Sequence, residues 1–178
     1  RTYTIEHYLG LVEKIRTAMP AASLTTDIIS GFPTEPEEEH RMTIELMREV
    51  RYDGAYTFKY SARENTKAWE MADDVSEEVK GQRVFEISQL QQKLSFDINQ
   101  KLVGTVERIL VEGPSKKSDE EWTGRTDTNK AVVFPKNGEI AGEYITIMIE
   151  RTSPAALFGR RVDVEGKIVG SMMMEAVV

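Results

Sequence analysis

The 178-residue sequence contains no cysteine and only two histidines, His7 and His40. Without cysteine the chain cannot form a disulfide, a thiolate zinc site or an iron–sulfur cluster ligated by its own side chains. The two histidines lie far apart in the sequence and lack a partner at a metal-binding spacing, so each is better explained as a helix-face residue than as a ligand. The sequence therefore predicts no metal site.

Long apolar runs are also absent. No stretch approaches the roughly 18 consecutive apolar residues that a membrane-spanning helix needs. The first residues lack the basic, apolar and small-residue pattern of a secretion signal, and the sequence begins with Arg1 rather than methionine. We therefore expect a soluble, cytoplasmic protein without a membrane partner, and a sequence that is part of a longer one.

Positive charge is scarce, because the formal net charge is −7. This balance argues against a general nucleic-acid binder, which usually carries a basic excess. The charge is uneven: residues 1–98 hold 12 basic and 18 acidic side chains, whereas residues 99–165 hold 10 and 11. The C-terminal part is therefore the better candidate for binding a polyanion.

Helical and strand patterns alternate in the first hundred residues. We expect helices at 5–18, after Thr34 and at 76–101, with strands at 24–29 and 54–60. Thr4, Thr34 and Ser76 are the expected N-terminal caps of the three helices, and Thr34 and Glu37 have the spacing of a capping box. The expected buried stripe of the third helix comprises Val79, Arg83, Ile87, Leu90, Leu94 and Ile98. This order of elements is typical of βα units around a parallel sheet.

After Gly104 the pattern changes to short β runs separated by Gly, Pro, Asn and Asp. Strands are expected at 105–111, 131–134, 144–149 and 156–164. Several short strands at close spacing indicate a small antiparallel barrel. The predicted division is α/β units at 1–75, a connecting helix at 76–101, a β-barrel at 102–165 and a tail of unknown role at 166–178.

Three strings, in this order, resemble the radical-SAM methylthiotransferases. Residues 26–35, TDIISGFPTE, resemble a motif late in the catalytic barrel of that family, and residues 56–63, YTFKYSAR, resemble its next strand and loop. Residues 124–134, GRTDTNKAVVF, resemble the core of its C-terminal TRAM domain, an oligonucleotide-binding-type barrel. The last string is more similar to the branch that methylthiolates isopentenyl-adenosine beside the tRNA anticodon than to the branch that modifies a ribosomal protein.

The sequence departs from the family pattern in two turns. The family usually has glycine where this chain has Thr34, and threonine where it has Pro36. It also usually has Pro-Gly where this chain has Glu64 and Asn65. The second change replaces a tight turn with a more flexible loop.

The resemblance implies a partial radical-SAM (TIM-like) α/β barrel followed by a small all-β TRAM (OB-like) barrel. It implies an intact parent that adds a methylthio group to tRNA adenosine and uses S-adenosylmethionine and two 4Fe-4S clusters. The cluster cysteines are missing from this chain. We therefore expect no catalytic residue here, no bound cofactor, and no activity of the chain alone.

In parallel sheets, ligands bind beyond the carboxyl ends of the strands. The resemblance accordingly assigns to the wall of the S-adenosylmethionine pocket Asp27, Ile29, Gly31, Phe32, Glu35, Tyr60 and Arg63. Gly31 would let the backbone approach an adenine, on whose face Ile29 and Phe32 would pack. The alternative is that the same residues only form a strand end, a turn and a helix start. The other acidic residues of the run 35–39 are expected to stabilise the positive end of the helix dipole.

Cations, amides and hydroxyls in the C-terminal part are candidates for contacts with phosphates or unpaired bases of a tRNA anticodon stem-loop. These candidates are Lys116, Lys117, Arg125, Thr126, Asn129 and Lys130. Arg125 is the best single candidate. Lys116 and Lys117 are equally well explained as a solvated loop, and Trp122 as either a base-stacking or a core residue.

Two other interpretations of the whole chain remain open. One is a stand-alone TRAM-type RNA-binding module with an α/β scaffold, and the other is a relative that modifies ribosomal protein. If the barrel is partial, strand 24–29 lacks a neighbour, and we expect self-association through its free edge, with the Met-rich residues 172–174 as a second patch. If the fold survives, Ile28→Lys is expected to shift the chain toward monomer.

Overall fold

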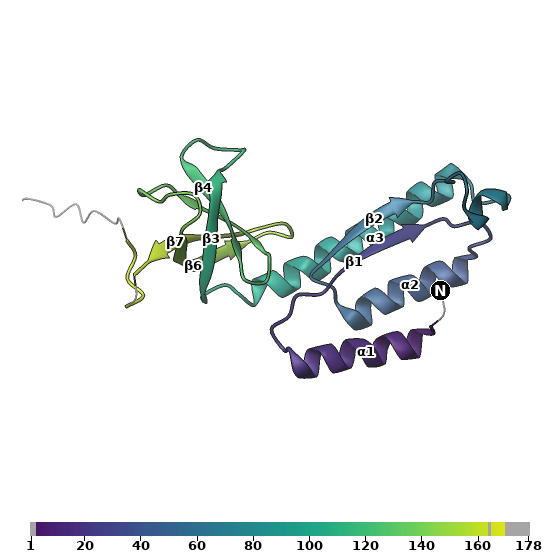
Figure 1. Ribbon diagram of the computed structural model, residues 1–178, viewed down its shortest axis with the longest axis horizontal. Coiled ribbons are helices and arrows are strands. Elements are labelled where there is room, and N and C mark those ends of the chain that lie inside the picture. The colour runs from purple at the N-terminus through teal and green to yellow at the C-terminus, as the bar shows by residue number, and fades with distance from the viewer. Residues whose placement is uncertain (1–2, 164, 170–178) are drawn as a thin grey trace, which may run out of the picture. The chain divides into compact units, whose positions relative to one another are not determined.

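The computed structural model describes residues 3–163 and 165–169. It divides the chain into two compact units, Arg1–Ser95 and Phe96–Val178, which are described separately below (Figure 1). Within the described residues, no helix combines the length and hydrophobicity needed to cross a membrane. Most of the expected tail, including Met172–Met174, lies outside the described residues.

Helices and strands alternate in the N-terminal unit. Its elements are α1 (Ile5–Ala18), β1 (Thr25–Ser30), α2 (Glu37–Val50), β2 (Gly54–Lys59), the short 3-10 helix η1 (Lys67–Glu70) and the first part of α3 (Glu77–Gln100). Strands β1 and β2 pair in parallel, with Thr25 opposite Gly54 and Ser30 opposite Lys59. The expected parallel pairing is therefore confirmed for these two strands. Within the described residues β1 pairs with β2 only, so its other edge is free.

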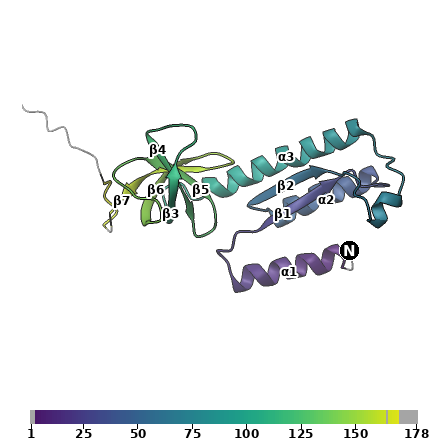
Figure 2. The same ribbon diagram turned by 45° about the horizontal axis from the view of Figure 1, so that its top comes forward.

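One face of the β1–β2 sheet packs on helices. Ile28 contacts a buried cluster that consists of Val12, Ile44, Met47, Val50, Tyr52, Ile87 and Leu94. The hydroxyl of Thr57 lies 3.0 Å from that of Ser88 on α3, which runs along β2 in both ribbon views (Figures 1 and 2). Because side chains alternate along a strand, the opposite face carries the neighbouring residues.

That opposite face is open and largely apolar. Asp27 lies opposite Tyr56, and Ile29 lies opposite Phe58. The exposed fractions of Ile29, Tyr56 and Phe58 are 60%, 71% and 52%. Soluble monomeric domains rarely expose an apolar sheet face to this extent, so this face is a candidate contact surface.

The helix caps agree with expectation at two of three positions. The hydroxyl of Thr4 accepts a bond from the N–H of His7, and that of Ser76 accepts one from the N–H of Val79. The expected cap at Thr34 is wrong: α2 begins at Glu37 after Pro36, without a side-chain cap. Thr34 instead has φ 66°, and its N–H donates to the carboxylate of Asp74. Glutamates in the first turn stabilise the start of α2 electrostatically.

The C-terminal unit is a closed five-stranded barrel. Its strands are β3 (Val106–Pro114), β4 (Glu121–Thr126), β5 (Ala131–Pro135), β6 (Tyr144–Thr152) and β7 (Leu157–Val162), arranged in the order β3-β4-β5-β7-β6. Four of the expected runs form strands. Sequence reasoning missed β4, and the expected all-antiparallel pairing is wrong for β5 and β7, which pair in parallel.

Aliphatic residues and one phenylalanine fill the barrel. They are Ile109, Val111, Val132, Phe134, Ile145, Ile147, Ile149 and Leu157. Two glycines allow neighbouring strands to approach closely. A Cβ atom at Gly124 would lie 2.5 Å from the carbonyl oxygen of Leu110, and one at Gly159 would lie 2.0 Å from that of Met148.

Candidate functional sites

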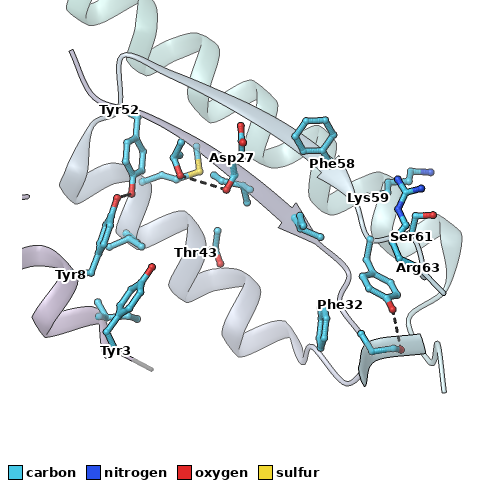
Figure 3. Close-up of a pocket in the computed structure, with 18 of the residues that line it drawn as sticks. Tyr3, Tyr8, Asp27, Phe32, Thr43, Tyr52, Phe58, Lys59, Ser61 and Arg63 are labelled. Carbon is cyan, nitrogen blue, oxygen red and sulfur yellow. Dashed lines mark hydrogen bonds between the residues drawn. The ribbon is translucent and has the colours of Figure 1, made fainter. Parts of the chain in front are cut away.

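A pocket of about 910 Å³ lies in the N-terminal unit (Figure 3). Its lining includes four consecutive residues of β1, from Thr26 to Ile29, whose side chains alternate between the two faces of the sheet. The pocket therefore passes around the free edge of β1. Figure 3 shows Tyr3 and Tyr8 at one end of the pocket and Ser61 and Arg63 at the other.

Five of the seven residues assigned to the cofactor wall line this pocket: Asp27, Ile29, Phe32, Tyr60 and Arg63. The rings of Phe32 and Tyr60 meet edge to face, with their centroids 5.1 Å apart. The hydroxyl of Tyr60 donates to the carbonyl of Ala68 at 3.1 Å, so this ring has a fixed position. The structure thus brings apolar, aromatic and charged side chains together at the carboxyl ends of two parallel strands.

Glu35 is absent from the lining of the pocket. One of its carboxylate oxygens accepts bonds from the backbone N–H groups of Gly31, at 2.9 Å, and Phe32, at 3.1 Å. The other lies 2.9 Å from a guanidinium nitrogen of Arg83, whose side chain is only 7% exposed. Through these contacts the carboxylate of Glu35 stabilises the turn after β1, and this turn positions Phe32.

Gly31 is also absent from the lining, and its neighbour is a lysine that sequence reasoning did not select. A Cβ atom at Gly31 would lie 2.3 Å from Cγ of Lys80, and the residue has φ 78°. The side chain of Lys80 is 2% exposed, and its ammonium lies 2.6 Å from Asp73 and 3.2 Å from Glu77. The bond to Asp73 raises the pKa of Lys80 above its ordinary value, and the bond from Lys80 lowers the pKa of Glu77.

The buried stripe of α3 explains why Lys80 was missed. The expected stripe began at Val79, which is 37% exposed, whereas Lys80 takes the buried position one turn before Arg83 and two turns before Ile87. Lys80, Arg83 and Ile87 are spaced by three and four residues, and this spacing in the sequence indicates that they share one face of the helix. A lysine in such a stripe is easily read as solvent-exposed, because lysine is rarely buried without a partner.

Neither histidine belongs to a group of potential metal ligands, and the described part of the chain holds no cluster of three or more such side chains. His40 is buried on α2, where Nε2 lies 2.9 Å from a carboxylate oxygen of Glu86. His7 is exposed on α1.

The residues assigned to RNA contacts lie at opposite ends of β4. Lys116 and Lys117 are exposed in the connection that precedes β4, and the others lie in or beside the turn that follows it. In that turn the guanidinium of Arg125 donates to the carbonyl of Asn129 at 3.1 Å and lies 3.3 Å from Glu112. Arg125 and Asn129 remain exposed.

Thr126 differs from its neighbours in the turn because it is buried. Its hydroxyl lies 3.0 Å from that of Thr128 and accepts a bond from the N–H of Lys130. Its contacts therefore fix the turn that carries Arg125. Trp122 packs against the barrel core, with the ammonium of Lys136 5.3 Å from its ring, which favours the core interpretation of this residue.

Residues 100–162 match the TRAM domain family, and a closed five-stranded barrel is the architecture found there. The chain is also similar to three bacterial proteins named tRNA-2-methylthio-N(6)-dimethylallyladenosine synthase. The protein from Carboxydothermus hydrogenoformans is 49% identical over 84% of this chain and 34% of its own length. Those from Porphyromonas gingivalis and Chloroherpeton thalassium are 45% and 44% identical over 92% and 89% of this chain, and 35% and 36% of their own lengths.

The chain thus spans about a third of the length of these relatives. The similarity runs through both units, because it covers more of the chain than either unit contains. We conclude that residues 100–162 form a TRAM domain and that the chain is a relative of the tRNA-2-methylthio-N(6)-dimethylallyladenosine synthases.

Proposed function

We propose that this chain supplies the RNA-binding barrel and part of the cofactor-pocket wall of a tRNA methylthiotransferase. The observation that carries the proposal is the 40–49% identity to synthases named for this tRNA modification, over 84–92% of the chain. The TRAM match covers the barrel and not the α/β unit, which supports separate roles for the two.

Three features of the α/β unit support a partial TIM-like barrel. Its two strands are parallel, one edge of β1 is free among the described residues, and the face that carries Ile29, Tyr56 and Phe58 is exposed. In a closed α/β barrel, that edge pairs with a preceding strand and that face points into the packed interior. We infer that the longer protein provides both contacts.

The residues present are suited to hold S-adenosylmethionine but cannot ligate a 4Fe-4S cluster. Ile29, Phe32 and Tyr60 provide apolar and aromatic surface for the adenine of S-adenosylmethionine, while Asp27 and Arg63 provide charges for its polar groups. The sequence has no cysteine, so the ligands of any 4Fe-4S cluster must come from outside this chain. Bound beside such a cluster, S-adenosylmethionine supplies the radical needed to functionalise an unactivated C–H bond.

In this proposal the chain's own residues bind and orient rather than react. Glu35 and Arg83 hold the turn that carries Phe32, and the hydrogen bond to Ala68 holds the Tyr60 ring. The chain alone is expected to bind no iron after anaerobic reconstitution and to lack methylthiotransferase activity. Stoichiometric iron and sulfide on the purified chain would contradict this assignment.

The proposed partner of the barrel is a tRNA anticodon stem-loop, contacted by Arg125 and the turn that contains Asn129. Each phosphate contact contributes about 0.7 to 0.9 to the slope of log K against log salt concentration. We expect the 178-residue chain to bind a labelled anticodon stem-loop with a salt-dependent affinity. We expect Arg125→Ala to weaken binding and to lower the slope by that amount.

The matched control is Arg48→Ala, which removes an exposed guanidinium from α2 in the other unit. It changes the net charge by the same amount and is expected to leave the slope unchanged. If wild type does not bind the stem-loop, the RNA-binding role is wrong. If both arginine variants behave alike, Arg125 is not a phosphate contact.

A further inference from the structure

The outer surface of β6, β3 and β4 carries a cross-strand row of side chains. Tyr144 on β6 and Arg125 on β4 both pair with Leu110 on β3, which lies between them. Each has buried neighbours along its own strand, so the three side chains point outward together. With strands about 4.8 Å apart, the tyrosine ring and the guanidinium lie on one continuous surface.

The aromatic ring of Tyr144 lies against the guanidinium of an arginine. The guanidinium carbon of Arg108, which lies on β3 two residues before Leu110, is 4.1 Å from the centroid of the ring. Tyr144 is nevertheless 55% exposed. A ring that contacts a cation and is more than half exposed has the composition of a platform for stacking a nucleic-acid base.

Where β3 and β6 pair, this surface presents no carboxylate, although the chain has a net charge of −7. The residues that face outward along the paired parts of β3 and β6 are Val106, Arg108, Leu110, Tyr144, Thr146 and Met148. The flanking carboxylates are paired, Glu112 with Arg125 and Glu150 with Arg160. An apolar and cationic surface of this kind complements a polyanion with flat, apolar groups.

We propose that this surface, the Tyr144 face, binds an unpaired base of single-stranded RNA. The ring of Tyr144 stacks on the base, Arg108 fixes the orientation of the ring, and Arg125 binds a neighbouring phosphate. Glu112 releases Arg125 at little cost, because both side chains are nearly half exposed and their ion pair is screened by water. This inference rests on the proposed RNA-binding role and names the class of ligand group, an unpaired base, that the barrel recognises.

The test compares two probes of equal length and charge: a labelled oligouridylate and an abasic oligomer with the same backbone. Stacking of one base on an aromatic side chain corresponds to about a 5-fold to 150-fold gain in affinity. We expect Tyr144→Ala to weaken oligouridylate binding by at least about fivefold and to leave abasic binding within twofold. Tyr144→Phe keeps the ring and is expected to retain the wild-type preference for the oligomer that carries bases.

Phe85→Ala is the matched control, because Phe85 is an aromatic residue on α3 with 65% exposure. It is expected to change neither affinity. Loss of binding to both probes in Tyr144→Ala would show a structural role for the ring and overturn the inference, as would unchanged binding to both. If wild type binds neither probe nor the stem-loop, the proposed RNA-binding role fails. If the wild-type chain binds the probes and Tyr144→Ala binds them with the same affinities, only the proposed stacking site is wrong.

Discussion

Thr34 holds a backbone conformation that β-branched residues rarely adopt. Its φ is 66°, in the left-handed region that favours glycine, and Asn65 has φ 65°. Both positions carry glycine in the methylthiotransferase pattern that the sequence resembles. At both departures from that pattern the backbone has a positive φ, which glycine adopts most easily, but the residue is not glycine. Asparagine tolerates this conformation better than threonine does.

Replacing Thr34 with glycine is expected to raise the free energy of unfolding by up to about 1 kcal/mol, because relief of left-handed strain outweighs the greater entropy of an unfolded glycine. The bond from the N–H of residue 34 to Asp74 is retained in this variant. Asn65→Gly is the control and should change stability less. Urea unfolding measures both, and a destabilised Thr34→Gly would show that the threonine side chain contributes more than the strain costs.

Gly31 and Lys80 are expected to be energetically coupled. Alanine at Gly31 places a methyl group against Cγ of Lys80 and must also take φ 78°, so we expect Gly31→Ala to destabilise the chain by about 1–3 kcal/mol. In a Lys80→Ala background the Cγ atom is gone, and what remains is the backbone strain and a 3.2 Å contact with Cβ of residue 80. A double-mutant cycle from urea unfolding should therefore give a smaller cost for Gly31→Ala in that background. Additive costs would mean that the contact with Lys80 does not contribute to the cost of replacing Gly31.

At the scale of elements, the sequence predicts the α/β order well because alternating apolar runs and turn residues mark each boundary. Helix α1 runs over the expected residues, β1 is shifted by one residue at both ends, and β2 ends one residue earlier than expected. β4 could not be predicted in this way, since Glu121–Thr126 is mostly polar and is stabilised as a strand by its antiparallel pairing with β3 and β5. A buried lysine next to a glycine is likewise a result of packing between segments nearly 50 residues apart.

The candidate sites also include features that the sequence could locate and features that only the folded structure shows. The motif residues after β1 could be located from the sequence, but Glu35 and Gly31 make contacts within the turn and with α3, which no local pattern reveals. Tyr144 and Arg108 belong to strands that are paired only in the folded barrel, so sequence reasoning had no reason to combine them.

Neighbouring isoleucines of β1 should respond differently to the same charge. Ile28 is half-buried and packs against the core cluster, whereas Ile29 faces solvent, so a lysine at Ile28 replaces apolar contacts with a charge and a lysine at Ile29 does not. We expect Ile28→Lys to lower the free energy of unfolding by about 1–3 kcal/mol and Ile29→Lys to leave the unit folded. Thermal unfolding followed by circular dichroism distinguishes the two, and equal losses would contradict the assignment of faces.

At the scale of the whole molecule, the free edge of β1 and the open face beside it should promote self-association of the isolated chain. Ile29→Lys adds a charge at this edge without disturbing the core, and we expect it to shift the chain toward monomer. Sedimentation velocity over a range of concentrations measures the shift. A wild-type chain that stays monomeric at high concentration would count against the partial-barrel proposal.

We propose that these 178 residues act as the corresponding third of a tRNA methylthiotransferase. A chimera tests it most directly: the matching segment of the Porphyromonas gingivalis synthase is replaced by this chain, and tRNA from a strain without its own synthase is analysed by nucleoside mass spectrometry. We predict that the chimera forms the methylthiolated adenosine, as the unaltered synthase does. A chimera that is folded and abundant and yet leaves the tRNA without a methylthio group would contradict the claim.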